Sequence, residues 1–251
     1  MEFNANCASI RDSFPWEALL ADYEWDAADL EGVYEVRNAL EASLQGWIRK
    51  GFPTGEGLKV ADDILRWGFG KGLPSQPEDW EETFRTAVER LITDEISEAV
   101  EVLLIGSNRL GIASVSKLLT FVEQTQFGIY DSRVAYALRN VTNGAHRVFP
   151  CPAWRANDQV TGDNAITRSP NKAVVAGEAY ESFVRWARRS AECLGTHHAF
   201  GYEKQWSPSF IEMALFMAGR VRCQDTLQEL RLRRFAGNRE KWFPRVTEHA
   251  H

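Results

Sequence analysis

The chain of 251 residues is long enough for one large domain or two small ones, and its formal net charge is −6. With 44% hydrophobic and 25% charged residues it has the composition of an ordinary globular protein. It contains neither an apolar run of membrane-spanning length nor a basic N-terminal region followed by an apolar stretch. We therefore expect no membrane segment, no secretory signal and a cytoplasmic location.

Apolar residues recur at helical spacing along most of the chain, which predicts an all-α fold. Ser13 as cap and Pro15 in the first turn predict the start of a short helix. The glycine run that begins at Gly68 lacks the GK[ST] ending of a phosphate loop, so we interpret it as a turn. The expected helices before residue 105 cover 26–49, 58–67, a segment starting near 75–77 and containing Trp80 to Leu91, and 93–104.

Two short amphipathic segments between Ile105 and Asn140 carry the candidate chemistry. In the first segment an apolar stripe begins at Val115, and Lys117 leaves the helix on the side away from that stripe. In the second segment Asp131 precedes an apolar helical face, where it is well placed to cap the helix N-terminus. A lysine and an aspartate so arranged suit nucleophilic catalysis, but they also fit a solvated lysine and a purely structural cap.

The C-terminal part of the chain is less regular. Residues 143–170 lose helical periodicity and contain several prolines, which predicts a long irregular loop. Helical patterns return at 174–194, at 209–221 and at 225–235. We expect a single domain over residues 1–251, with the two amphipathic segments inside residues 94–141 and basic helices within 209–245.

The charges are distributed unevenly along the chain. The first 35 residues are strongly acidic, whereas basic residues dominate from 220 to 245. Because phosphate affinity depends on the local field, the basic end is a candidate DNA-backbone contact, with Arg231, Arg233 and Arg234 as its centre. The alternative is that both ends are ordinary solvated helix faces.

The cysteines and histidines give no sign of a metal centre. The four cysteines are far apart and form no C-x-x-C pair, and the histidines lack a metal-binding spacing. This spacing also argues against a disulfide scaffold and a clustered iron–sulfur site, so we expect free thiols. Neither a metal nor another cofactor is expected.

The run SKLLTF, followed by FGIYDSRVAYAL, resembles the helix–hairpin–helix DNA glycosylases, in particular the 8-oxoguanine DNA glycosylase-like proteins of bacteria. The resemblance covers Gly111 to Leu138 and extends weakly to residues 210–216. It departs from the family in a shorter spacing from lysine to aspartate. In addition, Ala113 and Val115 stand where the hairpin turn of these enzymes carries glycine.

This resemblance implies a fold of two helical lobes with a cleft between them. It also implies excision of an oxidised or otherwise modified base from DNA, with Lys117 as nucleophile, Asp131 as its catalytic partner and possible strand cleavage at the resulting abasic site. Arg133 would bind a phosphate or orient the aspartate. Candidate residues for the base pocket are the aromatic side chains Trp206, Phe210, Phe216 and Trp67, each of which could equally belong to the core.

A second interpretation comes from a different functional class. The chain would then be a nucleic-acid- or nucleotide-binding or -modifying module that retains the glycosylase fold, with a role in bacterial antiviral defence. Lys117 and Asp131 favour the enzyme, and the altered hairpin favours the module. Protein partners are not predicted by either interpretation.

Overall fold

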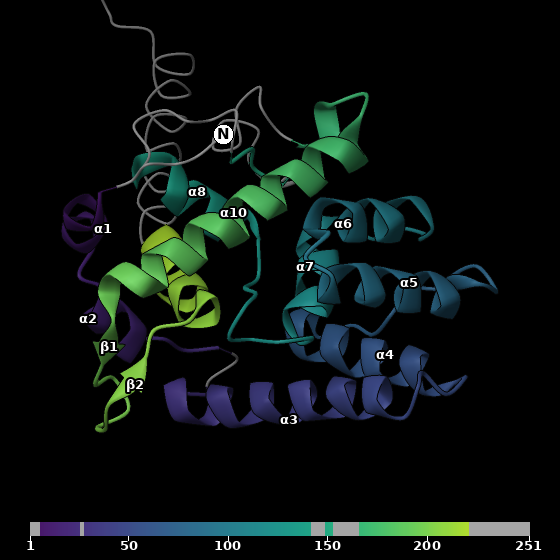
Figure 1. Cartoon of the computed structure of the whole chain (residues 1–251), viewed down its shortest axis with the longest axis horizontal. Helices are drawn as coiled ribbons and strands as arrows, with labels where there is room; N and C mark the ends of the chain where they lie inside the picture. The colour runs from purple at the N-terminus through teal and green to yellow at the C-terminus, as the bar shows by residue number, and fades with distance from the viewer. Residues whose placement is uncertain (1–5, 26–27, 142–148, 153–165, 221–251) are drawn as a thin grey trace, which may run out of the picture.

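The computed structural model describes residues 6–25, 28–141, 149–152 and 166–220. The described chain is mostly helical, as predicted (Figure 1). The sheet in these ranges is a two-stranded antiparallel hairpin, in which Thr196 pairs with Gln205. The elements are α1 (Cys7–Ser13), α2 (Trp16–Ala21), α3 (Leu30–Arg49), α4 (Glu56–Phe69), α5 (Trp80–Ile92), α6 (Ile96–Ile105), α7 (Ile112–Thr120), α8 (Ser132–Val141), η1 (Ile166–Arg168), α10 (Lys172–Leu194), β1 (Thr196–His197) and β2 (Lys204–Gln205), followed by a helical segment over 208–220.

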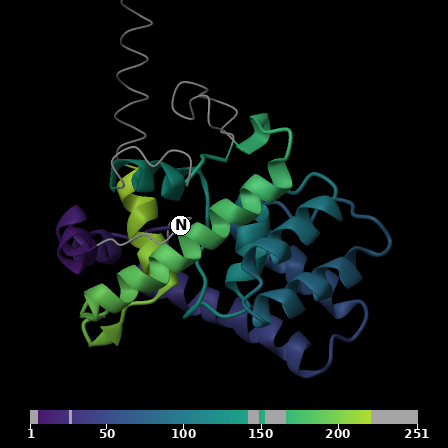
Figure 2. The ribbon, with the colours of Figure 1, turned by 45° about the horizontal axis from the view of Figure 1, so that its top comes forward.

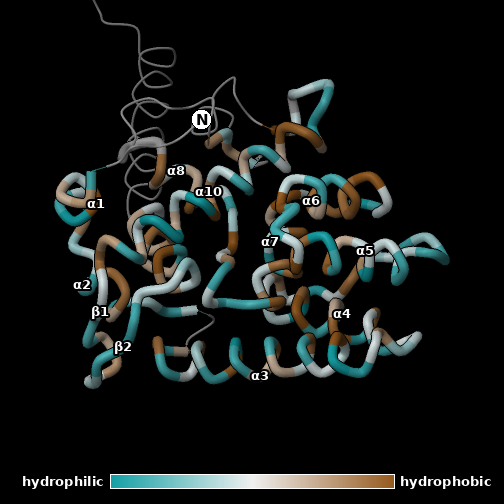
Figure 3. Tube along the Cα trace, viewed as in Figure 1, coloured by the Kyte–Doolittle hydropathy of each residue, from teal (hydrophilic) through white to brown (hydrophobic). Residues whose placement is uncertain are grey.

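The helices are arranged around two long ones. In Figure 1, α4, α5 and α6 are stacked on one side, whereas α1, α2 and the hairpin lie on the other. Helix α3 runs along the edge of both groups, and α10 crosses the molecule diagonally, which Figure 2 shows from a second direction. Hydrophobic and hydrophilic residues alternate along α3 in Figure 3, as expected for a helix with one face on the core.

The predicted end of the helix over 26–49 agrees with the structure, but α3 begins at Leu30, where Asp29 caps it by accepting a hydrogen bond from the N–H of Gly32 at 3.0 Å. Helix α4 runs two residues beyond its predicted end, so Gly68 and Phe69 belong to the helix and not to the predicted turn. Gly70 follows with a φ of 65°, the left-handed conformation that favours glycine at the end of a helix. The predicted cap at Ser13 is wrong, because Ser13 is the last residue of α1 and its hydroxyl donates to the carbonyl of Ile10 at 2.7 Å. Pro15 instead takes the position before α2.

Helices α6 and α10 pack closely at one glycine. A Cβ on Gly177 would lie 2.5 Å from Ser97 Oγ and 2.7 Å from Ser97 O, so only glycine allows this approach. Stacked rings fill the core next to α5, where Trp80 and Phe84 have centroids 5.3 Å apart and Phe84 stacks in turn on Trp47. Helix α7 lies beside α4 and α6, both of which also pack against α5.

The prediction of free thiols is wrong for two of the four cysteines. Cys7 in α1 and Cys193 in α10 form a disulfide across 186 residues of sequence. Next to it, the Nε of Arg11 donates to the carbonyl of Cys193 at 2.8 Å, so α1 is attached to the end of α10 twice. Sequence spacing missed the pair because the fold, not the local motif, brings the two residues together. Cys151 is buried, and Cys223 lies outside the described residues.

Among the described helices, none has both the length and the apolar character needed to cross a bilayer. The predicted irregular loop at 143–170 falls largely outside the described residues, and so does the predicted helix at 225–235. The described residues include one position of the basic segment, Arg220, which forms an ion pair of 2.7 Å with Glu24 of the acidic segment.

Candidate active site

Lys117 lies inside the protein rather than on its surface. Its side chain is only 3% exposed, although it leaves α7 opposite the apolar stripe that contains the fully buried Val115 and Leu118. The expectation of an outward lysine with little packing is therefore wrong, because α4 covers that side of α7. The lysine stem passes Gly68, where a Cβ would lie 2.5 Å from Lys117 Cδ and 2.6 Å from Cε.

Asp131 sits at the N-terminus of α8, as the sequence predicted. Its Oδ1 accepts hydrogen bonds from the backbone N–H groups of Arg133 at 2.9 Å and of Val134 at 3.0 Å. These two bonds fix the carboxylate, and the helix N-terminus stabilises its negative charge.

Hydrogen bonds between Ser116 and the backbone of Tyr130 explain how the aspartate comes close to the lysine. The N–H of Tyr130 donates to Ser116 Oγ at 3.0 Å, the Ser116 hydroxyl donates to the carbonyl of Tyr130 at 3.3 Å, and both residues are buried. Because Ser116 precedes Lys117 and Tyr130 precedes Asp131, these bonds hold the start of α8 against α7 at the level of the lysine.

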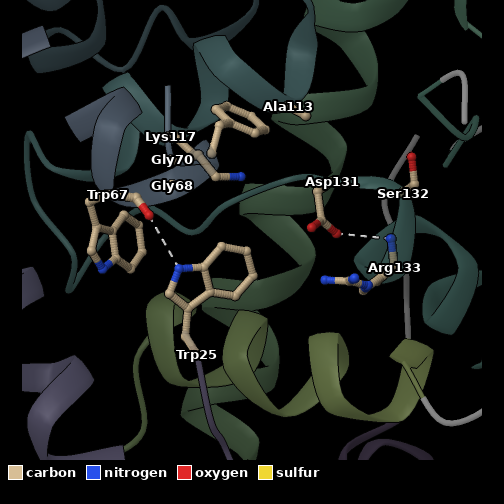
Figure 4. A pocket seen from close by; sticks show the side chains of 10 residues that line it. Trp25, Trp67, Gly68, Gly70, Ala113, Lys117, Asp131, Ser132 and Arg133 are labelled. Atoms are coloured by element: carbon tan, nitrogen blue, oxygen red, sulfur yellow. Dashed lines mark hydrogen bonds between the residues drawn. The ribbon is translucent and has the colours of Figure 1, made fainter. Parts of the chain in front are cut away.

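Both side chains line one cavity of about 650 Å³. Figure 4 shows the Lys117 amine and the Asp131 carboxylate pointing into the same space from opposite walls. A cavity of this size is in the range that binds small organic ligands. Its lining is Trp25, Trp67, Gly68, Phe69, Gly70, Ala113, Lys117, Asp131, Ser132 and Arg133.

Aromatic rings form much of the cavity wall. The indole N–H of Trp25 donates to the backbone carbonyl of Trp67 at 3.3 Å, and the two ring centroids are 6.0 Å apart (Figure 4). Behind them, Phe216 contacts Trp25 at 5.3 Å between ring centroids. The Arg133 guanidinium lies 4.5 Å above the ring of Phe216, a cation–π contact that directs this arginine along the cavity wall.

Burial lowers the pKa of Lys117 below the value of free lysine, since desolvation disfavours the ammonium form. Asp131 and then Glu212 oppose this shift, whereas the charges of Arg37 and Arg133 add to it. Despite the neighbouring carboxylate, the buried amine is therefore closer to its neutral, nucleophilic form than a surface lysine would be.

A buried polar network lies beneath the cavity. The Arg37 guanidinium donates to Gln124 Oε1 at 2.8 Å, to Glu212 Oε2 at 2.9 Å and to Ser209 Oγ at 2.8 Å. The same guanidinium lies 5.6 Å from the centroid of Trp67. This network thus links α3, the helical segment 208–220 and the aromatic wall, and it places two further charges near Lys117.

The structure brings together four of the predicted site residues, because Lys117, Asp131, Arg133 and Trp67 line the cavity. Phe216 lies behind the cavity wall, where its ring contacts Trp25 and the Arg133 guanidinium. Trp206 and Phe210 lie away from the cavity and pack against His197, with ring centroids 4.9 Å apart. Arg231, Arg233 and Arg234 fall outside the described residues.

Two important lining residues were not predicted from the sequence. Trp25 follows an acidic stretch without periodicity, so no pattern distinguished it from other tryptophans. Phe69 stands in the glycine run interpreted as a turn, and only the unusual placement of an aromatic residue there was a signal. Within the described chain, no group of three or more potential ligand residues could hold a metal ion.

The turn before α7 differs from the prediction. Ala113 and Val115 are both inside α7, where Ala113 lines the cavity and Val115 is fully buried. The turn that joins α6 to α7 instead covers residues 106–111, with Arg109 in the left-handed region at φ 62°. Ala113 and Val115, which were expected to replace glycines of the hairpin turn, therefore lie outside that turn.

Comparison of the chain with protein families, with curated proteins and with solved structures found no match in any of the three.

Proposed function

We propose that this protein is a DNA glycosylase that uses Lys117 to excise a modified base. The observation that carries the proposal is the presence of a buried lysine amine and a helix-capping aspartate on the wall of one cavity. The resemblance of residues 111–138 to the glycosylases supports it. The connection of α6 and α7 by a short turn directly before the lysine helix supports it as well.

The chemistry requires a neutral amine at the moment of attack. The nitrogen of Lys117 would form a bond to C1′ of the target nucleotide while the bond from C1′ to the base breaks, and the base leaves with that electron pair and takes up a proton. Positive charge that develops on the sugar would be stabilised by Asp131. Opening of the sugar ring then gives an imine with the lysine, from which strand cleavage can follow.

The cavity has the composition needed to receive an extruded base. A base leaves the duplex only if stacking inside the enzyme replaces stacking in DNA. Trp25, Trp67 and Phe69 supply aromatic surface, and Arg133 supplies a cation beside Asp131. A cavity of about 650 Å³ has room for one nucleoside.

Reduction of the imine by borohydride tests this function directly, because it links protein to DNA irreversibly. Oligonucleotides that carry several modified purines and pyrimidines should include at least one that the wild-type protein traps. Lys117→Met should abolish trapping while it retains most of the buried stem volume. Lys59→Met, an exposed lysine in α4, is the matched control and should trap normally.

Asp131→Asn separates the two roles of the aspartate. Asparagine also caps helices, so the fold should persist, but the loss of negative charge should slow trapping about a hundredfold or more. Undiminished trapping in Lys117→Met would assign the nucleophile to another residue. A wild-type protein that binds DNA yet traps none of the substrates would support a binding module instead.

A further inference from the structure

The exposed ring of Phe69 covers the amine of Lys117. The Lys117 Nζ lies 4.3 Å from the centroid of the Phe69 ring, which is within cation–π distance. Phe69 is 46% exposed, whereas Lys117 is 3% exposed, so the ring forms part of the boundary between the amine and solvent.

The neutral amine that attacks cannot keep a cation–π contact, because that contact requires the ammonium charge. A nucleophile must bring its nitrogen to about 3–3.5 Å from the carbon it attacks, with that direction free of other atoms. On one side the lysine stem is enclosed by Gly68, and on another the ring of Phe69 occupies the space over the nitrogen. The cavity reaches the amine from the side of Asp131, and a ligand that approaches the nitrogen over its Phe69 face has to move the ring.

Phe69 is placed where such a movement costs little. It is the last residue of α4, and Gly70 follows in the left-handed conformation that ends the helix. Nearly half of its surface is already in water, so few packing contacts oppose a change of rotamer. Trp67, two residues earlier, lies against the Arg37 guanidinium and is held more firmly.

We propose that Phe69 is a positioning residue that covers Lys117 in the resting protein and is displaced by the entering substrate, which releases the amine for attack. This inference rests on the proposed function for the identity of the substrate. The covering ring stabilises the ammonium form, and its removal favours the neutral amine. The charged groups that also face the amine are Asp131 at the start of α8, Glu212 in segment 208–220, Arg37 in α3 and Arg133 in α8.

Reductive methylation of the protein, without DNA, tests this role. Formaldehyde forms an imine with neutral amines, cyanoborohydride reduces it, and mass spectrometry then measures the modification of each lysine against pH. In Phe69→Leu, which keeps an apolar side chain but has no π face, Lys117 should react roughly threefold faster or more, with its apparent pKa lowered. Phe69→Tyr keeps the π face and should behave like wild type.

Lys59, exposed on the same helix, is the internal reference and should react equally in all three proteins. Equal rates and equal pH midpoints for Lys117 in wild type and Phe69→Leu would overturn the inference. A faster rate with an unchanged midpoint would overturn the statement that the ring stabilises the ammonium form, because Phe69 would then act on Lys117 by steric cover alone. The DNA-trapping assay is separate, so a protein inert on DNA whose Lys117 responds as expected would refute the glycosylase and leave the role of Phe69 standing.

Discussion

Arg37 and Glu212 form a fully buried ion pair, with 2.9 Å between Nη1 and Oε2 and side-chain exposures of 0% and 2%. The pair joins α3 to the helical segment 208–220 beneath the cavity that contains Lys117 and Asp131. Burial raises the pKa of Glu212, and the charge of Arg37 opposes that shift. Each partner thus limits the cost of burying the other, and the whole pair supports the wall of the cavity.

Arg37→Met should therefore destabilise the protein by about 3–5 kcal/mol, since it leaves a buried carboxylate without its cation. Urea denaturation measures the change in free energy of unfolding. The exposed pair of Lys50 and Glu56 provides a control, and Lys50→Met should cost at most about 1 kcal/mol. If Arg37→Met and Lys50→Met had equal effects, the buried pair would have no special structural role.

The rate of borohydride trapping should rise with pH and reach its plateau below the pKa of free lysine, about 10.4, because burial lowers the pKa of Lys117. The same shift affects stability. Between the lowered pKa and about 10.4 the unfolded chain binds more protons than the folded one, so the free energy of unfolding should increase as pH rises through this window. Lys117→Met should remove this increase, which pH-dependent denaturation can measure. A trapping profile with its midpoint at the value of free lysine would contradict the prediction.

Gly68→Ala should displace the Lys117 side chain, since the new Cβ would lie 2.5 Å from Cδ. We expect trapping to fall at least tenfold because small misplacements of reacting groups are costly. Gly46→Ala is the matched control, also within a helix but with nothing within 4 Å of the new Cβ. It should stabilise the protein by up to about 1 kcal/mol and leave trapping unchanged. Normal trapping by Gly68→Ala would show that the lysine has another route into the cavity.

Reduction of the bond between Cys7 and Cys193 should lower the free energy of unfolding by about 2–4 kcal/mol, because the unfolded chain gains freedom. Thermal denaturation with and without dithiothreitol measures this loss. Cys7→Ser should show the lower stability in both conditions, and a further effect of reductant on Cys7→Ser would point to a different disulfide.

Replacement of Arg231, Arg233 and Arg234 by glutamine should weaken DNA binding and flatten its dependence on salt. Each lost phosphate contact reduces the number of released counterions, so the slope of log affinity against log salt should fall by about one for each contact. Fluorescence anisotropy at several salt concentrations gives both quantities. An unchanged slope would identify these arginines as ordinary surface residues.

Local patterns in the sequence predicted the parts of the site that local physics determines. Asp131 was recognised as a cap because its role depends on the next few N–H groups, and the structure confirms that role. The end of α3 at Arg49 was predicted as well, whereas α4 continues two residues into the glycine run that was interpreted as a turn. Apolar spacing also identified the buried face of α7.

Features that depend on packing between distant parts of the chain could not be predicted from local sequence patterns. Lys117 was expected to point outward because periodicity describes one helix and contains no information about a second helix that covers its other side. The partnership of Arg37 with Glu212 and the disulfide between Cys7 and Cys193 connect residues separated by 175 and 186 positions. Trp25 reaches the cavity from the connection between α2 and α3, where it forms an isolated β-bridge with Ala28.

The order in which the ribosome makes the chain gives the Arg37–Glu212 contact a further consequence. Lys117 and Asp131 are both synthesised long before Glu212 and Ser209, which complete the binding of Arg37. Until those last residues emerge, burial of Arg37 is unfavourable, and the wall carried by Trp67 lacks its support. A half-made chain would contain Lys117 but not the finished cavity, so completion of the cavity would be coupled to one of the last long-range steps of folding.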